Sequence, residues 1–255
     1  LLAVYFDLVT VETFIYAMAG VFVLRMGIMK VYAFSLYLPK FRFQLPDNSG
    51  SVFKYSAMIL IAGSVAMILL DLDKVMIEHY LPIENVAVYG IAVYIATVIS
   101  VPQKAMHQIV HPITASMLNE KDKTGLVDIY KRSSLTWLVI SAIIFVLIIV
   151  NLNQLYSLIP KEYQISTVIV LLISLVKLYD NMLGNNNSIL FNSDYYRLVL
   201  VVGVILAVLA FIFNLLLILI YGILGSALAT FLAFFIYNTS KILIVINKFK
   251  MHPFT

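Results

Sequence analysis

Charged side chains inside long apolar runs are the residues of this sequence best suited to binding or chemistry. Lys177 lies in the apolar run 165–183, with Asp180 three and Asn181 four residues further on, so that these side chains can share one helical face. An ionisable group at bilayer depth costs roughly 2.5–3.5 kcal/mol and needs a partner, a watery cavity or a route to the interface. Two interpretations follow. Lys177 either neutralises Asp180 or reaches the interface, or it is a cavity cation tuned by Asp180.

A second group of polar residues recurs at helical spacing and falls within a narrow sector of one face, if the helix continues past Pro102. Its members are Tyr89, Ser100, Lys104, His107 and His111. Kinked helices are where transporters place binding sites, and Pro102 predicts a kink. The alternative is that the residues from Lys104 onward form an ordinary helix end. The two histidines have no acidic third ligand nearby, so no metal site is predicted.

Three further ionisable residues stand in apolar surroundings. Arg25 is near the middle of the run 13–37, too deep to reach water easily, and an arginine grips phosphate bidentately. Asp71 precedes Lys74 by three residues, which predicts an interfacial ion pair or a carboxylate coupled to an ion. We therefore select Arg25, Lys104, His107, Lys177 and Asn181 as candidates for substrate binding, and Asp71 and Asp180 as candidates for ion coupling.

Among the charged residues embedded in the apolar runs, basic residues outnumber acidic ones. Arg25, Lys104, Lys177 and Lys241 outnumber the carboxylates Asp71, Asp73 and Asp180. A polar cavity with net positive charge suits an anionic ligand such as a phosphate-bearing lipid.

The composition shows which elements must carry these residues. Of the 255 residues, 62% are hydrophobic and 12% are charged, whereas soluble domains carry about a quarter charged residues. Apolar runs long enough to cross a ~30 Å hydrocarbon core recur at 13–37, 55–77, 86–106, 134–151, 165–183, 198–220 and 223–246. These runs do not alternate as barrel strands would. The sequence predicts an all-α, polytopic membrane protein with about seven transmembrane helices.

Charges in the connecting segments predict the orientation. One side collects nine basic residues, Lys40, Arg42, Lys121, Lys123, Lys131, Arg132, Arg197, Lys248 and Lys250, whereas the other side has Lys161. The positive-inside rule places the Lys-rich side and the carboxyl terminus in the cytoplasm. The segment 126–134 is expected to be part of a solvated connector or a short helix on the membrane surface. The basic residues form no exposed block, so nucleic acid is not predicted as a partner, and the absence of cysteine excludes disulfides and thiolate sites.

Several stretches resemble polysaccharide biosynthesis flippases, which are relatives of the multidrug and toxin extrusion exporters. They are Asp73-Lys74-Val75-Met76-Ile77 with Val88-Tyr89-Gly90-Ile91-Ala92, then Val101-Pro102 with the run from Pro112 to Leu118, and the run from Tyr221 to Thr230. The resemblance extends from about residue 50 to the carboxyl terminus. It implies that residues 1–38 end an amino-terminal lobe, 39–54 form a cytoplasmic inter-lobe loop, 55–247 form a six-helix lobe and 248–255 a cytoplasmic tail. The missing amino-terminal part would supply the other lobe.

By this resemblance, the protein moves a polyprenyl-diphosphate-linked oligosaccharide across the cytoplasmic membrane by alternating access, for surface polysaccharides such as O-antigen. The expected partners are this lipid-linked oligosaccharide, membrane lipids and other polysaccharide assembly proteins. The reaction is movement, so no enzymatic activity, catalytic residue or cofactor is expected.

Three alternatives remain at this point. A drug exporter of the same superfamily would favour acidic and aromatic cavity residues for cationic substrates. A membrane-embedded glycan polymerase would need a sizeable outer loop with catalytic groups. A seven-helix receptor fits the number of spans but does not account for the Pro112 and Gly222 motifs.

Overall fold

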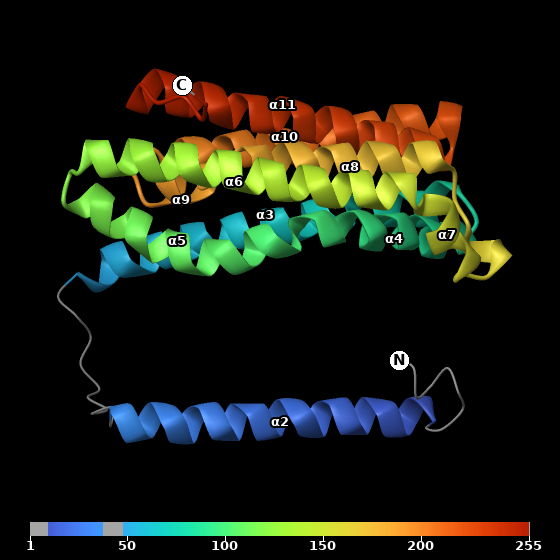
Figure 1. Cartoon of the computed structure of the whole chain (residues 1–255), viewed down its shortest axis with the longest axis horizontal. Helices are drawn as coiled ribbons and strands as arrows, with labels where there is room; N and C mark the ends of the chain where they lie inside the picture. Colours follow the sequence, from blue (N-terminus) through green and yellow to red (C-terminus); the bar gives the residue numbers. More distant parts are fainter. Residues whose placement is uncertain (1–9, 38–47, 255) are drawn as a thin grey trace. The chain divides into compact units, whose positions relative to one another are not determined.

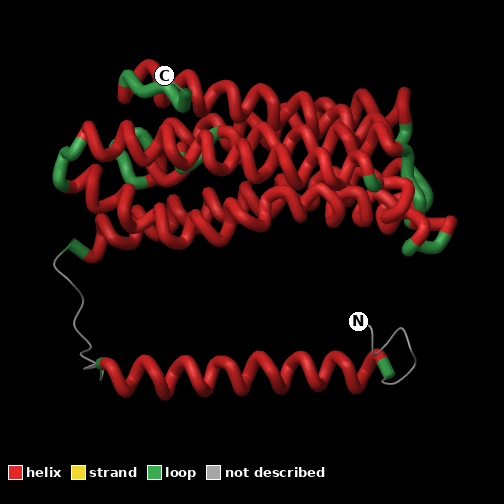
Figure 2. Tube along the Cα trace, in the orientation of Figure 1, coloured by secondary structure: helices red, strands yellow, loops and turns green. Residues whose placement is uncertain are grey.

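The computed structural model describes residues 10–37 and 48–254, and it divides into two compact units, Leu1–Phe53 and Lys54–Thr255. Every element in the described part is a helix, as Figures 1 and 2 show. Long apolar helices satisfy their backbone hydrogen bonds internally, which is what a bilayer requires. The predicted class, a helical membrane protein, is therefore confirmed for the described residues.

The first unit contains α2 (Val11–Leu36). Thr10 caps this helix, because its side-chain oxygen accepts a hydrogen bond from the backbone N–H of Thr13 at 3.3 Å. Nearly all of its described side chains are exposed, and most are apolar. The predicted inter-lobe loop 39–54 falls largely on residues 38–47, which lie outside the described part. Its last residues are already helical, because α3 begins at Ser49.

The second unit is a bundle of helices. Its first helix, α3, begins at Ser49, just before the boundary between the units at Phe53. Its α-helices are α3 (Ser49–Tyr80), α4 (Glu84–Thr97), α5 (Val101–Asn119), α6 (Lys123–Val150), α7 (Leu152–Ser157), α8 (Thr167–Met182), α9 (Asn186–Phe191), α10 (Tyr196–Tyr221) and α11 (Ile223–Phe249). Two 3₁₀ turns, η1 (Val98–Ser100) and η2 (Lys161–Tyr163), complete it.

Five stretches within the described residues are long and apolar enough to cross a membrane. They are Glu12–Leu36, Glu84–Asn119, Lys123–Val150, Tyr196–Tyr221 and Ile223–Phe249. The other two predicted spans correspond to α3, with 32 residues, and α8, with 16 residues. At 1.5 Å per residue α8 is about 24 Å long, which is shorter than a ~30 Å hydrocarbon core. The number of seven spans stays a prediction.

Helix α8 lies at the centre of the second unit, packed against α4, α6 and α11. Its apolar face buries Ile169, Val170, Ile173 and Val176. Around them a core cluster gathers side chains from α3, α4, α7 and α11, including Ile77, Tyr89 and Leu152. Because three helices surround α8, its polar residues face neighbouring helices rather than lipid alone.

The segment 126–134 is not a separate surface helix, and that prediction was wrong. It forms the first turns of the continuous helix α6, because Leu126, Tyr130 and Trp137 follow one buried stripe. Asp122 caps the helix by accepting a hydrogen bond from the Gly125 N–H at 3.0 Å. The Gly125 N–H and the Thr124 hydroxyl, which both donate to the carboxylate, lower the pKa of Asp122.

Glycine allows two close contacts between helices. Gly222, with a φ of +58°, turns the chain between α10 and α11. A Cβ at Gly225 would overlap the backbone carbonyl of Leu217 on α10, so this pair of helices approaches closely. Gly184, with a φ of +55°, leads from α8 into α9 against Ser133 and Ser134 of α6. Both the conformation and the space require glycine at Gly184.

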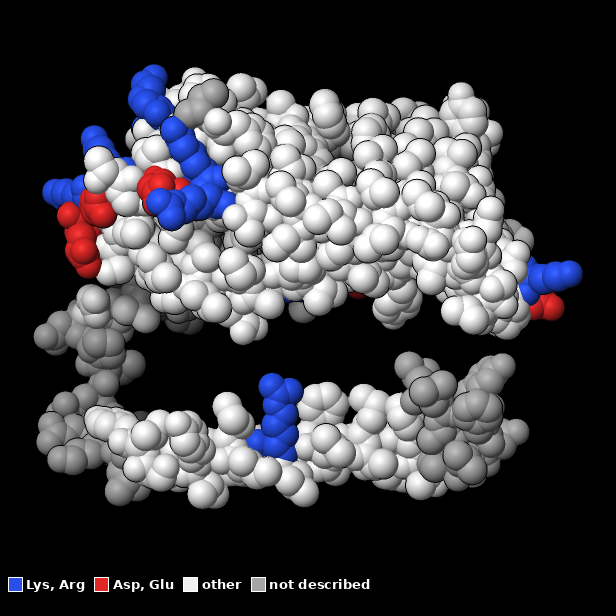
Figure 3. All heavy atoms as spheres, viewed as in Figure 1, with Lys and Arg blue, Asp and Glu red and all other residues white. Residues whose placement is uncertain are grey.

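On the face of the second unit that Figure 3 shows, the charged residues gather at the two ends. Figure 3 shows blue and red side chains at both ends and an almost uncharged band between them on the visible face. One end, named the basic end here, holds the α5–α6 turn and the carboxyl-terminal residues 250–254, whereas α7 lies at the opposite end (Figure 1). An uncharged band between charged ends matches a bilayer with water on both sides.

Candidate functional site

The last two turns of α8 carry the polar residues around which the candidate site is built. Lys177, Asp180 and Asn181 all lie in this part of the helix, as their spacing predicts. In the structure, however, these side chains contact different neighbours. The neighbouring helices, not the spacing within α8, decide which contacts form.

Asp180 forms its ion pair with Lys241 of α11, not with Lys177. The Lys241 Nζ lies 3.4 Å from the Asp180 Oδ1, and the side chains are 1% and 32% exposed, respectively. The pairing of Lys177 with Asp180, which the spacing allowed, is therefore not formed. The physical reason is that α11 packs directly against α8 and brings a fully buried cation to the carboxylate.

Lys241 has two further contacts that hold its charge inside the bundle. Its Nζ donates a hydrogen bond to the Asn187 Oδ1 at 3.2 Å. It also lies 4.4 Å from the centre of the Tyr237 ring, within range of a cation–π interaction. A buried ammonium needs such partners, since an isolated buried charge is very costly.

Lys177 is left as a half-buried cation without a direct partner. It forms no hydrogen bond or ion pair with any residue in the described part of the chain. Asp180, Lys104 and Asp73 are close enough to act on it electrostatically. Because Asp180 already forms an ion pair with Lys241, the charge of Lys177 is only partly compensated.

Asn181 is fully buried and joins helices. Its Nδ2 donates to the backbone carbonyl of Ile99 at 2.9 Å and to the Ser141 hydroxyl on α6. Asn181 thereby fixes α8 against α6 and the 3₁₀ turn η1. It is not among the residues that line the pocket described next.

An open pocket of about 550 Å³ lies between α5, α8 and α9. Its lining residues are Gln103, Lys104, His107, Gln108, His111, Pro112, Asp180 and Asn187. The pocket brings together three predicted site residues, Lys104, His107 and Asp180. Two of its lining residues, Asp180 and Asn187, are also the hydrogen-bond partners of the buried Lys241.

The polar face of α5 depends on how the helix passes Pro102. The chain changes from α4 to the 3₁₀ turn Val98–Ser100 and starts α5 at Val101, with Pro102 in the first turn, where the missing N–H costs little. Pro112 lies inside α5. The predicted polar face of five residues is therefore formed only in part: Lys104, His107 and His111 share one face of α5, whereas Tyr89 and Ser100 lie before Val101, are buried and do not line the pocket. Lys104 and His111 are exposed, and His107 is half-buried.

The two histidines form a pair within the pocket. Their ring centres are 5.9 Å apart, and the His107 ring lies at the same distance from the Trp137 ring of α6. The His107 Nε2 is 3.5 Å from the Ser188 hydroxyl, and the His111 Nε2 is 3.4 Å from the Asn192 Nδ2. Both partners come from α9 or the residue that follows it. No group of three His, Asp or Glu side chains arranged for a metal occurs in residues 10–37 and 48–254.

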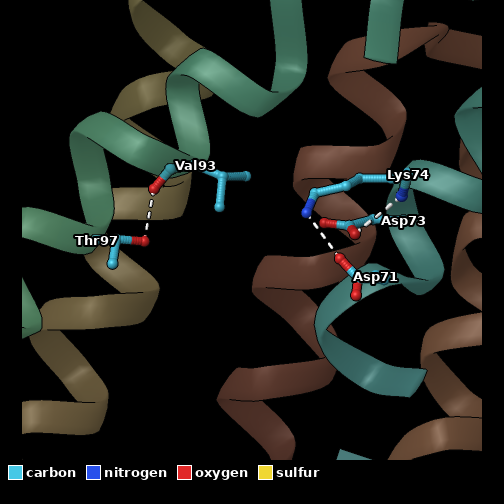
Figure 4. A network of polar contacts seen from close by, with 5 residues as sticks. All are labelled: Asp71, Asp73, Lys74, Val93 and Thr97. Atoms are coloured by element: carbon cyan, nitrogen blue, oxygen red, sulfur yellow. Dashed lines mark hydrogen bonds and ion pairs between the residues drawn. The ribbon is translucent and has the colours of Figure 1, made fainter. Parts of the chain in front are cut away.

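Asp71 lies elsewhere, on α3, and pairs with Lys74 at 2.7 Å. Figure 4 shows Lys74 reaching toward Asp71, beside Asp73, and, apart from them, the Thr97 hydroxyl of α4 donating to the Val93 carbonyl. Asp71 is exposed, whereas Asp73 is 7% exposed and accepts a hydrogen bond from the Lys74 backbone N–H at 2.9 Å. The buried carboxylate of this region is thus Asp73, not the predicted Asp71.

Arg25 belongs to the first unit. It is exposed on α2, in an apolar groove with Val21, Leu24, Ile28 and Met29. Of the five predicted substrate-binding residues, Lys104 and His107 thus line the pocket, and Lys177 interacts electrostatically with Lys104. Asn181 instead holds α8 against its neighbours, and Arg25 lies on α2 of the first unit.

The structure adds residues that the site prediction did not include. His111 lay on the predicted polar face, and Lys241 was noted as an embedded cation, but neither was selected. Asn187 lies on α9, a six-residue helix with no apolar periodicity. The feature that could have identified it is the polar run Asn185-Asn186-Asn187-Ser188 between two spans.

No family model matches this chain, and no curated protein or solved structure is significantly similar to it. Any functional conclusion therefore depends on the geometry and the charge of the pocket.

Proposed function

We propose that this protein is a flippase that moves a polyprenyl-diphosphate-linked oligosaccharide across the cytoplasmic membrane, with the α5–α8–α9 pocket receiving the diphosphate. One observation carries the proposal. Asp180 is paired with the buried Lys241 at 3.4 Å, which leaves Lys104 at the open pocket without this counter-ion. Lys177, which interacts electrostatically with Lys104, is only partly compensated, by Asp180 and Asp73. An anionic ligand with two negative charges matches these two cations.

The charge balance decides between an anionic and a cationic ligand. The cations Lys104, Lys177 and Lys241 outnumber the two carboxylates that act on them, Asp180 and the buried Asp73. Two unit charges 4 Å apart attract each other by about 1 kcal/mol in water and by about 4 kcal/mol near a protein surface. A diphosphate in the pocket would gain this larger attraction, whereas a cationic drug would be repelled.

The depth of these residues fits a headgroup that enters from the basic end. With Thr167 of α8 at the opposite membrane surface, Lys177 lies ten residues or ~15 Å into the helix, near the bilayer centre. With Glu84 at the same surface, Lys104 lies ~30 Å away along the helix, at the inner boundary of the core. Lys104 is therefore suited to receive an anion from the cytoplasm, and Lys177 to attract it further inward.

The outer surface of the bundle suits a lipid-linked substrate. Many large apolar side chains are exposed on the long helices, for example Val201, Ile205 and Val208 on α10. In a bilayer these side chains contact lipid tails. The prenyl chain of the substrate can stay among the lipids while its diphosphate and sugars occupy the polar pocket.

The alternatives fit the described residues less well. A multidrug exporter of the same superfamily would be favoured by an acidic pocket, but the one acidic lining residue is already paired. A glycan polymerase, which is an enzyme, would need catalytic groups on a sizeable outer segment. The connections at the opposite end, 81–83 and 151–166, are short and consist in part of α7 and η2.

The proposal is tested by depleting the protein in its own cell. The lipid-linked oligosaccharide should then accumulate in the inner leaflet and surface polysaccharide should disappear, while tolerance to cationic drugs is unchanged. Loss of drug tolerance with normal surface polysaccharide would favour the exporter instead.

A further inference from the structure

The pocket contains two imidazole side chains. His107 and His111 line it together with Lys104, and an imidazole ordinarily titrates near pH 6.5. The one carboxylate in the lining is Asp180, which is held in its ion pair with Lys241. The two histidines are therefore the groups in this pocket whose charge a ligand can change most easily.

We propose that His107 and His111 take up protons when a diphosphate binds in the pocket, so that anion binding at this site is linked to pH. The inference rests on the proposed function, and it goes beyond it by identifying protons as a co-ligand of the anion. With both rings protonated, the pocket offers three cationic side chains on one face of α5. With both rings neutral, Lys104 is the remaining cation on this face.

The surroundings of the two rings allow both charge states. The hydroxyl of Ser188, 3.5 Å from His107, can donate to a neutral nitrogen or accept from a protonated one. The Asn192 Nδ2, 3.4 Å from the His111 Nε2, can donate to a neutral ring nitrogen, and turning the amide over would bring its oxygen to accept from a protonated one. Neither ring is therefore fixed in one charge state by its neighbour on this side.

The charged groups around the pair set the balance. Lys104 lies on the same helix, and each histidine repels the other when both are charged. From α8, Asp180 acts on His107 as an opposite charge, reduced by Lys241 of α11 behind it. Helix α6 presents the uncharged Trp137 to His107, and α9 presents Ser188. In the empty pocket the repulsion opposes double protonation, and a bound dianion removes that repulsion.

The size of the effect follows from proton linkage. Each proton taken up on binding changes the affinity by up to tenfold per pH unit. The pocket should therefore bind a dianion most tightly in mildly acidic solution, and the affinity should fall as the pH rises and the rings lose their protons. Two protons would give a change of up to a hundredfold per pH unit.

The test measures proton uptake directly. The purified protein in lipid nanodiscs is titrated calorimetrically with P1,P2-dimethyl diphosphate, a diester that stays dianionic across neutral pH, in two buffers with different ionisation heats. The difference between the heats gives the number of protons bound. We expect net uptake, reduced in His107→Gln and in His111→Gln, and abolished in the double variant, whose affinity no longer depends on pH.

Matched controls separate this pair from other groups. His79→Gln, at the end of α3, should leave the proton uptake unchanged, and Lys104→Gln should weaken binding without reducing the proton number to zero. His111 is exposed, so its variant stays informative if His107→Gln disturbs the contact with Trp137. Binding without proton uptake would overturn this inference and leave the proposed function standing. No diphosphate binding at any pH would overturn both.

Discussion

The Lys241 Nζ and the Asp180 Oδ1 lie 3.4 Å apart and join α11 to α8 across 61 residues of sequence. The lysine is 1% exposed and the aspartate 32% exposed, so the pair is buried on one side and open to the pocket on the other. This ion pair has two consequences. It holds the central helix α8 against α11, and it removes the negative charge that would otherwise balance Lys177.

Breaking this pair from one side should destabilise the protein. Asp180→Leu leaves a buried ammonium without a counter-ion and should cost about 3–5 kcal/mol, whereas Lys241→Leu should cost less, because the partly exposed Asp180 can be solvated. The double variant should recover most of the loss, since two well-packed apolar residues replace two charges. The measurement is a double-mutant cycle of unfolding midpoints in detergent.

The exposed pair Asp71–Lys74 is the matched control for that cycle. Removing either member should cost at most about 1 kcal/mol, because both side chains are substantially exposed. If the losses of Asp180→Leu and Lys241→Leu simply add in the double variant, the two charges do not interact in the way that the structure indicates.

Gly225→Ala should force α10 and α11 apart. The added methyl group would overlap the carbonyl of Leu217, and overpacking of this kind typically costs about 1–3 kcal/mol. Gly203→Ala on α10 is the control, because a Cβ there has no described atom within 4 Å. That change should be neutral or stabilise the helix by up to about 1 kcal/mol. Equal melting temperatures for the two variants would show that the close contact is absent.

Acidification should loosen the start of α6. The pKa of Asp122 is lower in the folded protein than in the unfolded chain. The cap therefore contributes its full stabilisation at pH values above the ordinary aspartate pKa of about 3.9, and this stabilisation is lost as the pH falls through the lower pKa of the folded protein. Amide protection at Gly125 and Leu126 should therefore fall in acid. Asp122→Asn keeps an acceptor oxygen and should remove the pH dependence, whereas Asp122→Ala should lose the protection at every pH. A wild-type protection that does not change with pH would contradict this prediction.

Labelling tests the orientation. The chain contains no cysteine, so single cysteines can be introduced without further changes. Cysteines that replace Lys123 or Lys250 at the basic end should react with an impermeant reagent only from the cytoplasm, and those that replace Glu84 or Lys161 only from outside. Labelling of the Lys123 position from outside would reverse the topology.

The helical fold could be predicted because its signal is local. Apolar runs and their lengths identify membrane helices without any knowledge of neighbours, and the face shared by Lys104, His107 and His111 follows from helical spacing. The segment 126–134 was misjudged because its polar residues suggested a surface, whereas its buried stripe of Leu126 and Tyr130 continues into the apolar part of α6.

The partners of the site residues could not be predicted, because they depend on which helices pack together. The spacing of Lys177 and Asp180 permitted a local pair, but α11 supplies Lys241 from 61 residues away. Asn181, next to Asp180 in sequence, turns to α6 because adjacent helical residues point about 100° apart. The buried acid of α3 is Asp73 rather than Asp71 for the same reason.

The most direct test of the central claim is the flipping of a fluorescent polyprenyl-diphosphate oligosaccharide in proteoliposomes that contain Lys177 variants. Lys177→Ala should abolish or strongly reduce flipping although the protein still inserts, because it removes an only partly compensated cation at a low-dielectric site. Lys177→Arg should keep part of the activity, since the charge remains while the geometry changes. Because Asp180 pairs with Lys241, adding Asp180→Leu to Lys177→Leu should not restore flipping. Full activity of Lys177→Ala, or of the double variant Lys177→Leu with Asp180→Leu, would contradict the account.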